Sequence, residues 1–546
     1  MKNSNSKIIW FIVALILLNL ISSKFYQRFD LTEDARYSLS EPTKNIIQNI
    51  NSPIFIEVYL EGNFPAEFKR LQIETKLHLE ELSNLNNKIR FKFINPENKI
   101  EELFNKGLTP SNLQIQESGS VKEIIILPWA VVKYNGKSEN ISLLKDIYSN
   151  TQNEQLEASI QNLEYAFASA IQKLTVEKSK KIAVLRGNGE LEDIRIHSLL
   201  SKLGENYFIA PFTLDSVANN PIGSLEQLSK FDLAIIAKPT QKFSEKEKYT
   251  LDQFIMNGGK TLWLIDNVQA ELDSLMNTGE ALAYPRDLGL TDLLFSYGVR
   301  LNTDLITDLY SSEIPLATGK VGNKTQFNSF LWKYFPLVNS KNSHPINSNI
   351  EAVNFKFANS IDTLKNSVSK TILLASSIYS KPEGTPKLIS LNTISAPRNQ
   401  KDFNNGSKFL SVLLEGNFKS AYSERIKPFN LNLGMLKSKS NKIIVISDGD
   451  VISNDILKGQ PTELGIDKWT NQQFGNKEFL LNCVNYLLDN SGLIELRSKK
   501  IKINFLDKQK AYSEATKWQT LNIVIPLILL GLFGVIFNYL RRKKYR

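Results

Sequence analysis

The sequence predicts an α/β protein with one transmembrane helix at each end of the chain, and two observations support this prediction. Apolar runs occupy residues 8–21 and 521–540 of the 546 residues. Between them, strand-like and helix-like segments alternate, as they do in α/β folds. The composition is that of a globular chain, since 42% of the residues are hydrophobic and 22% are charged.

The first apolar run, IIWFIVALILLNLI, is interpreted as an uncleaved anchor over residues 8–24. The run is short for a membrane span, but the residues that follow it, up to Tyr26, can complete it at the membrane interface. A cleaved signal peptide is the alternative interpretation. Because no small-residue cleavage site and no nearby cysteine for lipidation follow the run, we favour the anchor.

The second run, residues 521–540, has about the 20 residues that a bilayer-spanning helix needs. It is followed by RRKKYR, residues 541–546, which carries five positive charges. Under the positive-inside rule this basic tail is cytoplasmic, and Lys2 and Lys7 place the N-terminus on the same side. The region between the two runs is therefore expected on the other side of the membrane.

The net charge of +10 follows this topology rather than a nucleic-acid partner. Lys2 and Lys7 supply two of these charges and the terminal tail supplies five, so that about three remain for the long region between the apolar runs. A nucleic-acid-binding protein concentrates its basic charge in its folded part. We therefore expect a lipid bilayer as a partner and no nucleic acid.

Residues 25–150 are expected to form the first domain. Its predicted elements are a helix opened by Ser40, a strand, a helix, a strand, a short helix and a hairpin that turns at Asn135-Gly136. Those after the first helix are expected at 53–62, 64–86, 88–96, 99–106 and 123–144. The order resembles a thioredoxin-like fold, in which Pro128 stands where a cis-proline is usual. Redox activity is not expected, because the start of the first long helix reads GNFPAEF and holds no thiol.

A helix over residues 151–180 is expected to link this domain to a larger one, residues 181–493. In the larger domain, buried-type strands alternate with helices, which predicts a mainly parallel, doubly wound sheet. The pattern is interrupted at about 267–440, which we interpret as an irregular insertion with extra strands. Residues 494–518 are expected to form a short, strand-bearing stalk next to the membrane.

The loop RGNGELED, residues 186–193, is the best-placed candidate for a ligand or contact site. It leaves the carboxyl end of a parallel strand, where open α/β sheets bind ligands. The candidate residues are Gly187, Asn188, Gly189 and Glu190. The glycine spacing is not a dinucleotide fingerprint, and the carboxylates would repel a phosphate. A structural turn is the favoured interpretation, contact with a ligand or partner is the next, and catalysis is the last.

No group of residues predicts catalysis, a metal site or a cofactor. The single cysteine, Cys483, excludes an internal disulfide and a multi-cysteine metal site, and its apolar surroundings predict a buried side chain. The histidines His78, His197 and His344 are far apart in the sequence. The acidic turn SDGDVIS, residues 447–453, lacks the spacing of a calcium loop, and the chain has neither a P-loop nor a G-x-S-x-G elbow.

Four segments of the chain resemble a known family: FDLTEDARYSLSEPT (29–43), LRGNGELED (185–193), LLEGNFKSAYSERI (413–426) and FLLNCVNYLLDN (479–490). They are similar to the GldG family of gliding-motility-associated ABC-transporter components and to its wider group, the ABC-type uncharacterised transport system proteins. The group often has His where this chain has Asn188. Because an amide does not titrate, this difference weakens any proposal of acid–base chemistry in the loop.

The resemblance implies a non-catalytic subunit of the cell inner membrane with a large periplasmic region, which works with an ABC transporter permease and a separate ATPase. It also implies an amidotransferase-like second domain without active residues. We expect a scaffold, coupling or substrate-contact role in gliding motility. A periplasmic glycan or peptide receptor for the transporter is the alternative, and an enzyme with an unrecognised site is less favoured.

The stretch FDLTEDARYSLSEPT is expected to bind a partner close to the membrane. Phe29, Tyr37 and Leu39 would supply apolar anchors against the permease. Asp30 and Arg36 would supply polar pairing. The alternative is that these residues only brace the chain's own first domain.

Overall fold

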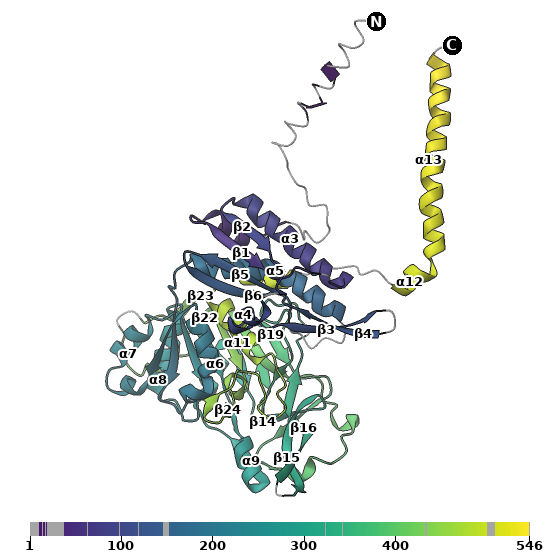
Figure 1. The fold of residues 1–546 in the computed structure, drawn as a ribbon. Coiled ribbons are helices and arrows are strands. Elements are labelled where there is room, and N and C mark those ends of the chain that lie inside the picture. The colour runs from purple at the N-terminus through teal and green to yellow at the C-terminus, as the bar shows by residue number, and fades with distance from the viewer. Residues whose placement is uncertain are drawn as a thin grey trace. The chain divides into compact units, whose positions relative to one another are not determined.

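The computed structural model describes residues 38–544, except residues 63, 98, 118–119, 146–151, 323, 341, 432–433 and 500–507, and also six residues between 10 and 18. It is a mixed α/β structure with several sheets, as the sequence predicts. The chain divides into two units, Met1–Lys500 and Ile501–Arg546 (Figure 1). The expected N-terminal anchor lies largely outside the described residues, and the six that are described there are helical.

The first part of the larger unit is a four-stranded sheet with its helices. Its elements are α2 (Glu41–Gln48), β1 (Ile54–Val58), α3 (Ala66–Leu85), β2 (Ile89–Phe93), α4 (Ile100–Asn105), β5 (Trp129–Tyr134) and β6 (Lys137–Ser142). The strands are ordered β2-β1-β5-β6, with β1 parallel to β2 and antiparallel to β5. Asn135 and Gly136 have φ angles of 45° and 77° and turn β5 into β6, as predicted.

A second hairpin, β3 (Ser111–Glu117) with β4 (Ser120–Ile126), was not predicted. Residues 123–126 belong to β4, whereas the sequence pattern suggested that they belong to the strand that ends at the Asn135-Gly136 turn. That strand begins only at Trp129. The peptide bond before Pro128 is not cis; among the described residues the cis bond is Thr385–Pro386.

Helix α5 (Gln152–Thr175) follows this sheet, where the sequence predicts the linking helix. Its buried face carries apolar residues at helical spacing, namely Leu156, Ile160, Leu163, Phe167 and Ile171. The helix packs against α3 and α2 of the first part and against η5 (Leu493–Ser498), a short 3-10 helix near the end of the larger unit. It therefore contacts both ends of the described part of that unit.

The main sheet of the larger unit has nine strands. They are β7 (Lys181–Arg186), β8 (Phe208–Thr213), β9 (Leu233–Ala237), β10 (Lys260–Leu264), β13 (Val299–Leu301), β18 (Ile361–Thr363), β19 (Ser369–Ala375), β22 (Phe409–Lys419) and β23 (Lys437–Ile446). Their order is β13-β18-β22-β23-β10-β9-β7-β8, with β19 also beside β22. The five strands from β23 to β8 are parallel, as predicted.

Four strands of the insertion expected at about 267–440, namely β13, β18, β19 and β22, belong to this sheet, and its other strands form small sheets. Strand β22 pairs antiparallel with β23, and β18, β19 and β13 extend the sheet further. The sheet is therefore mixed. Parallel strands connect through helices, whereas β22 comes back beside β23 through a turn region, a pairing that local periodicity does not specify.

Helices cover both faces of the main sheet (Figure 1). Helices α6 (Asp193–Gly204) and α11 (Asn476–Leu488) pack on one face, and Cys483 of α11 is fully buried there, as predicted. Helices α7 (Pro221–Leu228), α8 (Glu245–Met256) and α10 (Thr291–Tyr297) pack on the other face. Alternate residues of each strand enter the two cores, as for Val184 and Leu185 of β7.

The remaining elements of the larger unit are short or belong to small sheets. They are η1 (Asp215–Ala218), β11 (Val268–Gln269), α9 (Leu272–Thr278), β12 (Glu280–Pro285), β14 (Asp304–Asp308), β15 (Ser311–Val321), β16 (Lys324–Val338), β17 (Val353–Asn354), β20 (Ser380–Gly384), β21 (Lys387–Ser390), η2 (Leu391–Thr393), η3 (Gln400–Asp402), η4 (Asp450–Ile452), β24 (Ile456–Leu457) and β25 (Gln460–Pro461).

The described residues of the smaller unit form α12 (Lys508–Ser513) and α13 (Ala515–Lys544). Helix α13 is long and apolar enough to cross a membrane, and within the described part of the chain it is the helix that meets this test. In the expected stalk, residues 494–518, the described residues form helical turns rather than a strand.

Candidate functional site

The predicted loop 186–193 lies where the strand order reverses. From β7 the chain passes to β8 on one side and then to β9 on the other, so that the loops after β7 and β9 are neighbours. Gly187 and Gly189 both have positive φ angles, of 112° and 72°. A Cβ atom at Gly189 would lie 2.1 Å from Thr240 Oγ1, so glycine is required for the two loops to approach.

Asn188 joins the two loops through its backbone. Its carbonyl oxygen accepts hydrogen bonds from the amides of Thr240 and Gln241, both at 2.9 Å. Its own amide donates to Glu190 Oε2 at 2.8 Å, and its side-chain Nδ2 is 3.4 Å from Glu247 Oε2. The four predicted residues are thus brought together with the loop after β9. Asn188 is buried, and its contacts with described residues support the interpretation as a structural turn.

Two oxygen atoms of this loop are buried and accept no hydrogen bond from the described residues. They are Asn188 Oδ1 and Glu190 Oε1. Burial raises the pKa of Glu190, because removal from water disfavours the charged carboxylate. The loop therefore holds a carboxyl group with a raised pKa, next to an amide that does not titrate.

A buried charge cluster lies beside this loop, at the carboxyl ends of β9, β10 and β23. Its centre is Lys238, whose Nζ is 2.7 Å from Asp450 Oδ1, 3.0 Å from Glu271 Oε2 and 3.3 Å from Asp266 Oδ2. The backbone amide of Gly449 donates to Asp266. A Cβ atom at Gly449 would lie 2.4 Å from Lys238 Cγ, so the acidic turn 447–453 packs directly on this lysine.

The cluster raises the pKa values of Asp266, Asp448 and Lys238, for different reasons. Burial raises the pKa of Asp266 to about 6, and burial followed by the charges of Asp266 and Asp450 raises the pKa of Asp448 well above its usual range. Burial disfavours the charge of Lys238, but the carboxylates of Asp450, Asp266 and Glu271 outweigh it and raise the pKa of Lys238. The lysine therefore stays charged and holds the three strand ends together.

The described residues contain no group of three or more His, Cys, Asp and Glu side chains that could hold a metal ion. The acidic turn 447–453 uses its carboxylates internally, since Asp448 accepts hydrogen bonds from the amides of Lys356 and Asp450. The arrangement is that of a turn at the end of a strand.

A second site, the Glu164 junction, was not predicted. It consists of Glu164 on α5 with Ser38, Ser40, Thr43 and Lys499. Glu164 Oε1 accepts hydrogen bonds from the Ser40 amide at 2.7 Å and from Thr43 Oγ1 at 2.9 Å. Its Oε2 lies 3.1 Å from Lys499 Nζ, which also donates to the Ser38 carbonyl oxygen at 3.2 Å. One carboxylate thus binds the start of α2 and the segment after η5.

The electrostatics of the junction favour a charged glutamate beside a neutral histidine. Burial opposes the charge of Glu164, but Lys499 and the hydrogen bonds from Ser40 outweigh it and lower the pKa of Glu164. His78 of α3 is partly buried, and burial lowers the pKa of His78 to about 4. Its ring lies 5.8 Å from that of Phe167 on α5.

Apolar and polar contacts extend the junction to the main sheet. Leu493 and Leu496 of η5 pack with Ala168 of α5, and Ile46 and Tyr165 lie against them. Arg497 then donates to Glu478 of α11 at 2.9 Å, and Lys145 pairs with the same carboxylate. Helix α5 is in this way connected to a helix that covers the main sheet.

Of the residues predicted as a partner interface, Phe29, Asp30, Arg36 and Tyr37 lie outside the described residues. Leu39 is described and is partly buried. The sequence does contain a signal for Glu164, which lies four residues after Ile160 and four before Ala168, on the buried face of α5. Lys499 has no comparable local signal.

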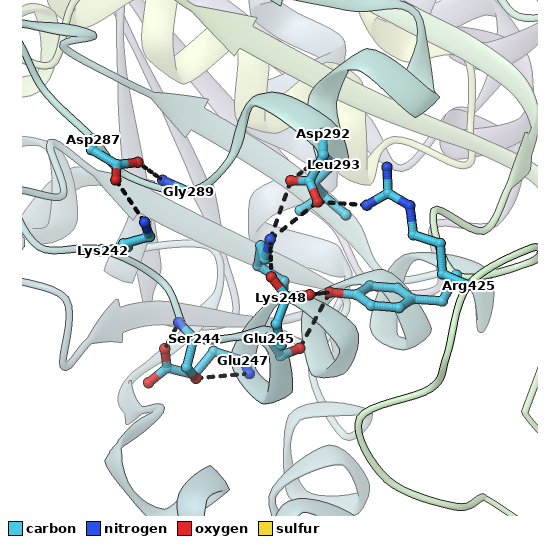
Figure 2. Close-up of polar contacts among 11 residues, drawn as sticks. Lys242, Ser244, Glu245, Glu247, Lys248, Asp287, Gly289, Asp292, Leu293 and Arg425 are labelled. Atoms are coloured by element: carbon cyan, nitrogen blue, oxygen red, sulfur yellow. Dashed lines mark hydrogen bonds and ion pairs between the residues drawn. The ribbon is translucent and has the colours of Figure 1, made fainter.

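The segment LLEGNFKSAYSERI has a structural explanation in the contacts after β22. Figure 2 shows Lys248 of α8 between Glu245 and Asp292, with Arg425 on Asp292. Tyr422 donates to Glu245 Oε2 at 2.8 Å, and Ser420 donates to the buried Asp252 at 2.6 Å. The segment therefore attaches the end of β22 to α8 and α10.

Comparison with known proteins matches residues 179–483 to the family described as ABC-type uncharacterized transport system. Residues 33–133 match a domain of unknown function, DUF7088. An uncharacterized protein of Borreliella burgdorferi (strain ATCC 35210 / DSM 4680 / CIP 102532 / B31) is 22% identical, over 100% of this chain and 99% of its own.

A solved structure described as the mmIFT52 N-terminal domain is 14% identical and covers 57% of this chain and 99% of its own. Its TM-score of 0.32 supports no assignment of the fold. The family match covers more than half of the chain, including the main sheet, the loop 186–193 and the acidic turn. The chain belongs to the ABC-type uncharacterized transport system family.

Proposed function

We propose that the chain is a non-catalytic, membrane-anchored subunit of an ABC transporter complex associated with gliding motility, of the GldG type. Its larger unit would lie in the periplasm, with spans at residues 8–24 and 521–540 and both termini in the cytoplasm. Membership of the transport family supports an accessory role. The apolar helix α13 and its basic end support attachment to the inner membrane in this orientation.

The observation that carries the proposal is the Glu164 junction. Ser38 and Ser40 follow the expected first span, and Lys499 precedes α13. Ser40 and Lys499 bind Glu164 of α5, and Lys499 also binds Ser38. Helix α5 also packs on α3 and is connected to α11. A displacement of the segment at Ser40 or of the segment at Lys499 would therefore reach both the four-stranded sheet and the main sheet of the larger unit. This is the property that a scaffold or coupling subunit needs.

Within this proposal the larger unit contains two modules. Residues 25–150 would be a thioredoxin-like module without redox cysteines, joined by the helix 151–180 to an amidotransferase-like module, residues 181–493. The order β2-β1-β5-β6, with α3 between β1 and β2, supports the first assignment. The peptide bond at Pro128, which is not cis, counts against that detail of the resemblance. Residues 494–518 would lead to the membrane.

The stretch 29–43 would dock against the permease through Phe29, Asp30, Arg36, Tyr37 and Leu39. The structure gives this stretch a fixed end, because Ser40 and Thr43 bind Glu164. Residues immediately before a fixed point lose less conformational entropy when a partner orders them. The loop Gly187–Glu190 would act as a contact between modules of the complex rather than as a catalytic site.

Purification from native membranes in a mild detergent tests the proposed function. We expect a permease and an ATPase of the same transporter to co-elute with the chain. Recovery of the intact chain alone, at several detergent strengths, would contradict the proposal. The topology has its own test, in which protease added to spheroplasts should cleave the region 25–517 and spare the tail 541–546.

A double substitution, Arg36→Ala with Tyr37→Ala, tests the docking stretch. It should reduce co-elution of the permease without unfolding the larger unit. The control is Glu41→Ala with Lys44→Ala, which removes an exposed ion pair of the nearby α2. Equal loss of the permease in both variants would show that the stretch has no specific role.

A further inference from the structure

The junction between α12 and α13 has two exposed aromatic side chains. Tyr512 of α12 is 90% exposed, and Trp518 in the first turn of α13 is 52% exposed. From Leu521 to Leu540 the exposed surface of α13 is almost wholly apolar. Tyr and Trp are enriched where a membrane span meets water, because their rings are apolar and their polar atoms can stay hydrated.

The indole of Trp518 is oriented as a position between a membrane span and water requires. Its Nε1–H donates to Glu514 Oε2 at 2.9 Å, on the side of the helix that leads back to α12. Lys517 Nζ lies 5.7 Å from the centre of its ring. The charged residues Glu514 and Lys517 therefore lie before Trp518, and no charged residue follows until Arg541.

The spacing of the aromatic residues matches the thickness of a bilayer. Tyr539, which is 66% exposed, is the last aromatic residue before the basic run Arg541–Lys544. At 1.5 Å per residue, Trp518 and Tyr539 are separated by about 32 Å along the helix. The hydrocarbon core of a bilayer is about 30 Å thick.

We infer that Trp518 and Tyr539 mark the two lipid–water interfaces, and that α12 lies in the headgroup layer with Tyr512 against lipid. The inference rests on the membrane attachment in the proposed function. It adds which residues of α13 lie at each surface of the bilayer. The span begins three residues earlier than the apolar run alone suggests. Lys510 and Lys517 are placed where they can reach lipid phosphates.

Depth-dependent quenching tests this inference on the full chain. Single cysteines at Tyr512, Ser513, Trp518 and Leu530 are labelled with an environment-sensitive fluorophore, while Cys483 is buried and serves as the unlabelled background. The labelled chain is reconstituted into phosphatidylcholine–phosphatidylglycerol vesicles. The quenchers are aqueous iodide and lipids with a nitroxide at the headgroup, near the glycerol or deep in the acyl chain.

We expect headgroup nitroxides to quench position 512, shallow nitroxides to quench position 518, and deep nitroxides to quench position 530. Ser513, the neighbour of Tyr512 on another side of α12, should be quenched by iodide instead. Quenching of both 512 and 513 by iodide alone would overturn the placement of α12. Quenching of position 518 by deep nitroxides or by iodide would overturn the placement of Trp518 at the lipid–water interface. Failure of the chain to stay with the vesicles would instead contradict the membrane attachment itself.

Discussion

Lys499 Nζ lies 3.1 Å from Glu164 Oε2, although 335 residues separate the two positions in the sequence. The other oxygen of the same carboxylate binds Ser40 and Thr43, more than 120 residues earlier than Glu164. A single side chain thus fixes the beginning and the end of the described part of the larger unit to α5. Loss of its charge should affect both segments together.

Glu164→Gln should lower the free energy of unfolding of the detergent-solubilised chain by about 2 kcal/mol, because the partly buried Lys499 loses its counter-charge. Lys499→Met should cost less, since Ser40 and Thr43 still bind the carboxylate. Urea denaturation followed by circular dichroism measures both. Lys44→Met, which removes an exposed pair with Glu41, is the control and should change little. Equal stability of Glu164→Gln and the wild type would show that the junction contributes nothing.

The partly buried His78 should make stability depend on pH in a defined window. Burial lowers the pKa of His78 to about 4, whereas an unfolded histidine titrates near 6.5. Between these values the unfolded chain binds a proton that the folded chain does not, so stability falls as the pH falls. The contribution reaches about 3 kcal/mol at the lower end of the window.

His78→Gln removes this contribution. Urea denaturation at pH 7, 6 and 5 should show a smaller loss of stability with falling pH in the variant than in the wild type. The comparison is needed because Asp266, with a pKa raised to about 6, changes stability in the opposite direction. His197→Gln, at an exposed position, serves as the matched control. Parallel curves for His78→Gln and the wild type would contradict the prediction.

Gly189→Ala tests the contact between the loops after β7 and β9. The added Cβ would meet Thr240 Oγ1 at 2.1 Å, and the φ angle of 72° is unfavourable for alanine. We expect a loss of about 2 to 3 kcal/mol in the free energy of unfolding. Gly107→Ala has a similar φ angle of 83° but no atom within 4 Å of the added Cβ. Its cost should be about 1 kcal/mol. Equal costs would indicate that the loops separate easily.

Local chemistry explains which elements the sequence predicts. Asn135-Gly136 specifies a tight hairpin because both residues accept positive φ angles. Ser244 and Glu247 form the capping box that starts α8, so the helix boundary depends on four adjacent residues. The parallel strands β7 to β10 are short apolar runs separated by helices. In each case the determining residues are close together in the sequence.

The elements that escape prediction depend on distant partners. Strand β22 is apolar on both faces, and nothing within it distinguishes pairing with β23 from a separate sheet. Glu164 lies on the buried face of α5, but nothing near it in the sequence specifies Lys499 and Ser40 as its partners. Of the candidate sites, the loop Gly187–Glu190 lies at the carboxyl edge of the sheet, as predicted. The sequence places it there because neighbouring residues determine where a strand ends. The Glu164 junction requires the whole tertiary structure.

Lys238→Met provides the strongest test of the buried charge cluster. The lysine contacts Asp450, Asp266 and Glu271 and is almost fully buried, so its removal leaves buried carboxylates without a counter-charge. Loss of one partner of a buried ion pair costs about 3 to 5 kcal/mol. The remaining carboxylates would then favour their neutral forms. The deficit in the free energy of unfolding should shrink as the pH is lowered from 7 to 5, because protonation removes the unpaired charge.

Urea denaturation of Lys238→Met and the wild type at both pH values measures this change. Lys242→Met, which removes a solvent-exposed pair with Asp287, should show neither the deficit nor its pH dependence. A pH-independent deficit in Lys238→Met would mean that lost packing, rather than unpaired charge, accounts for the cost.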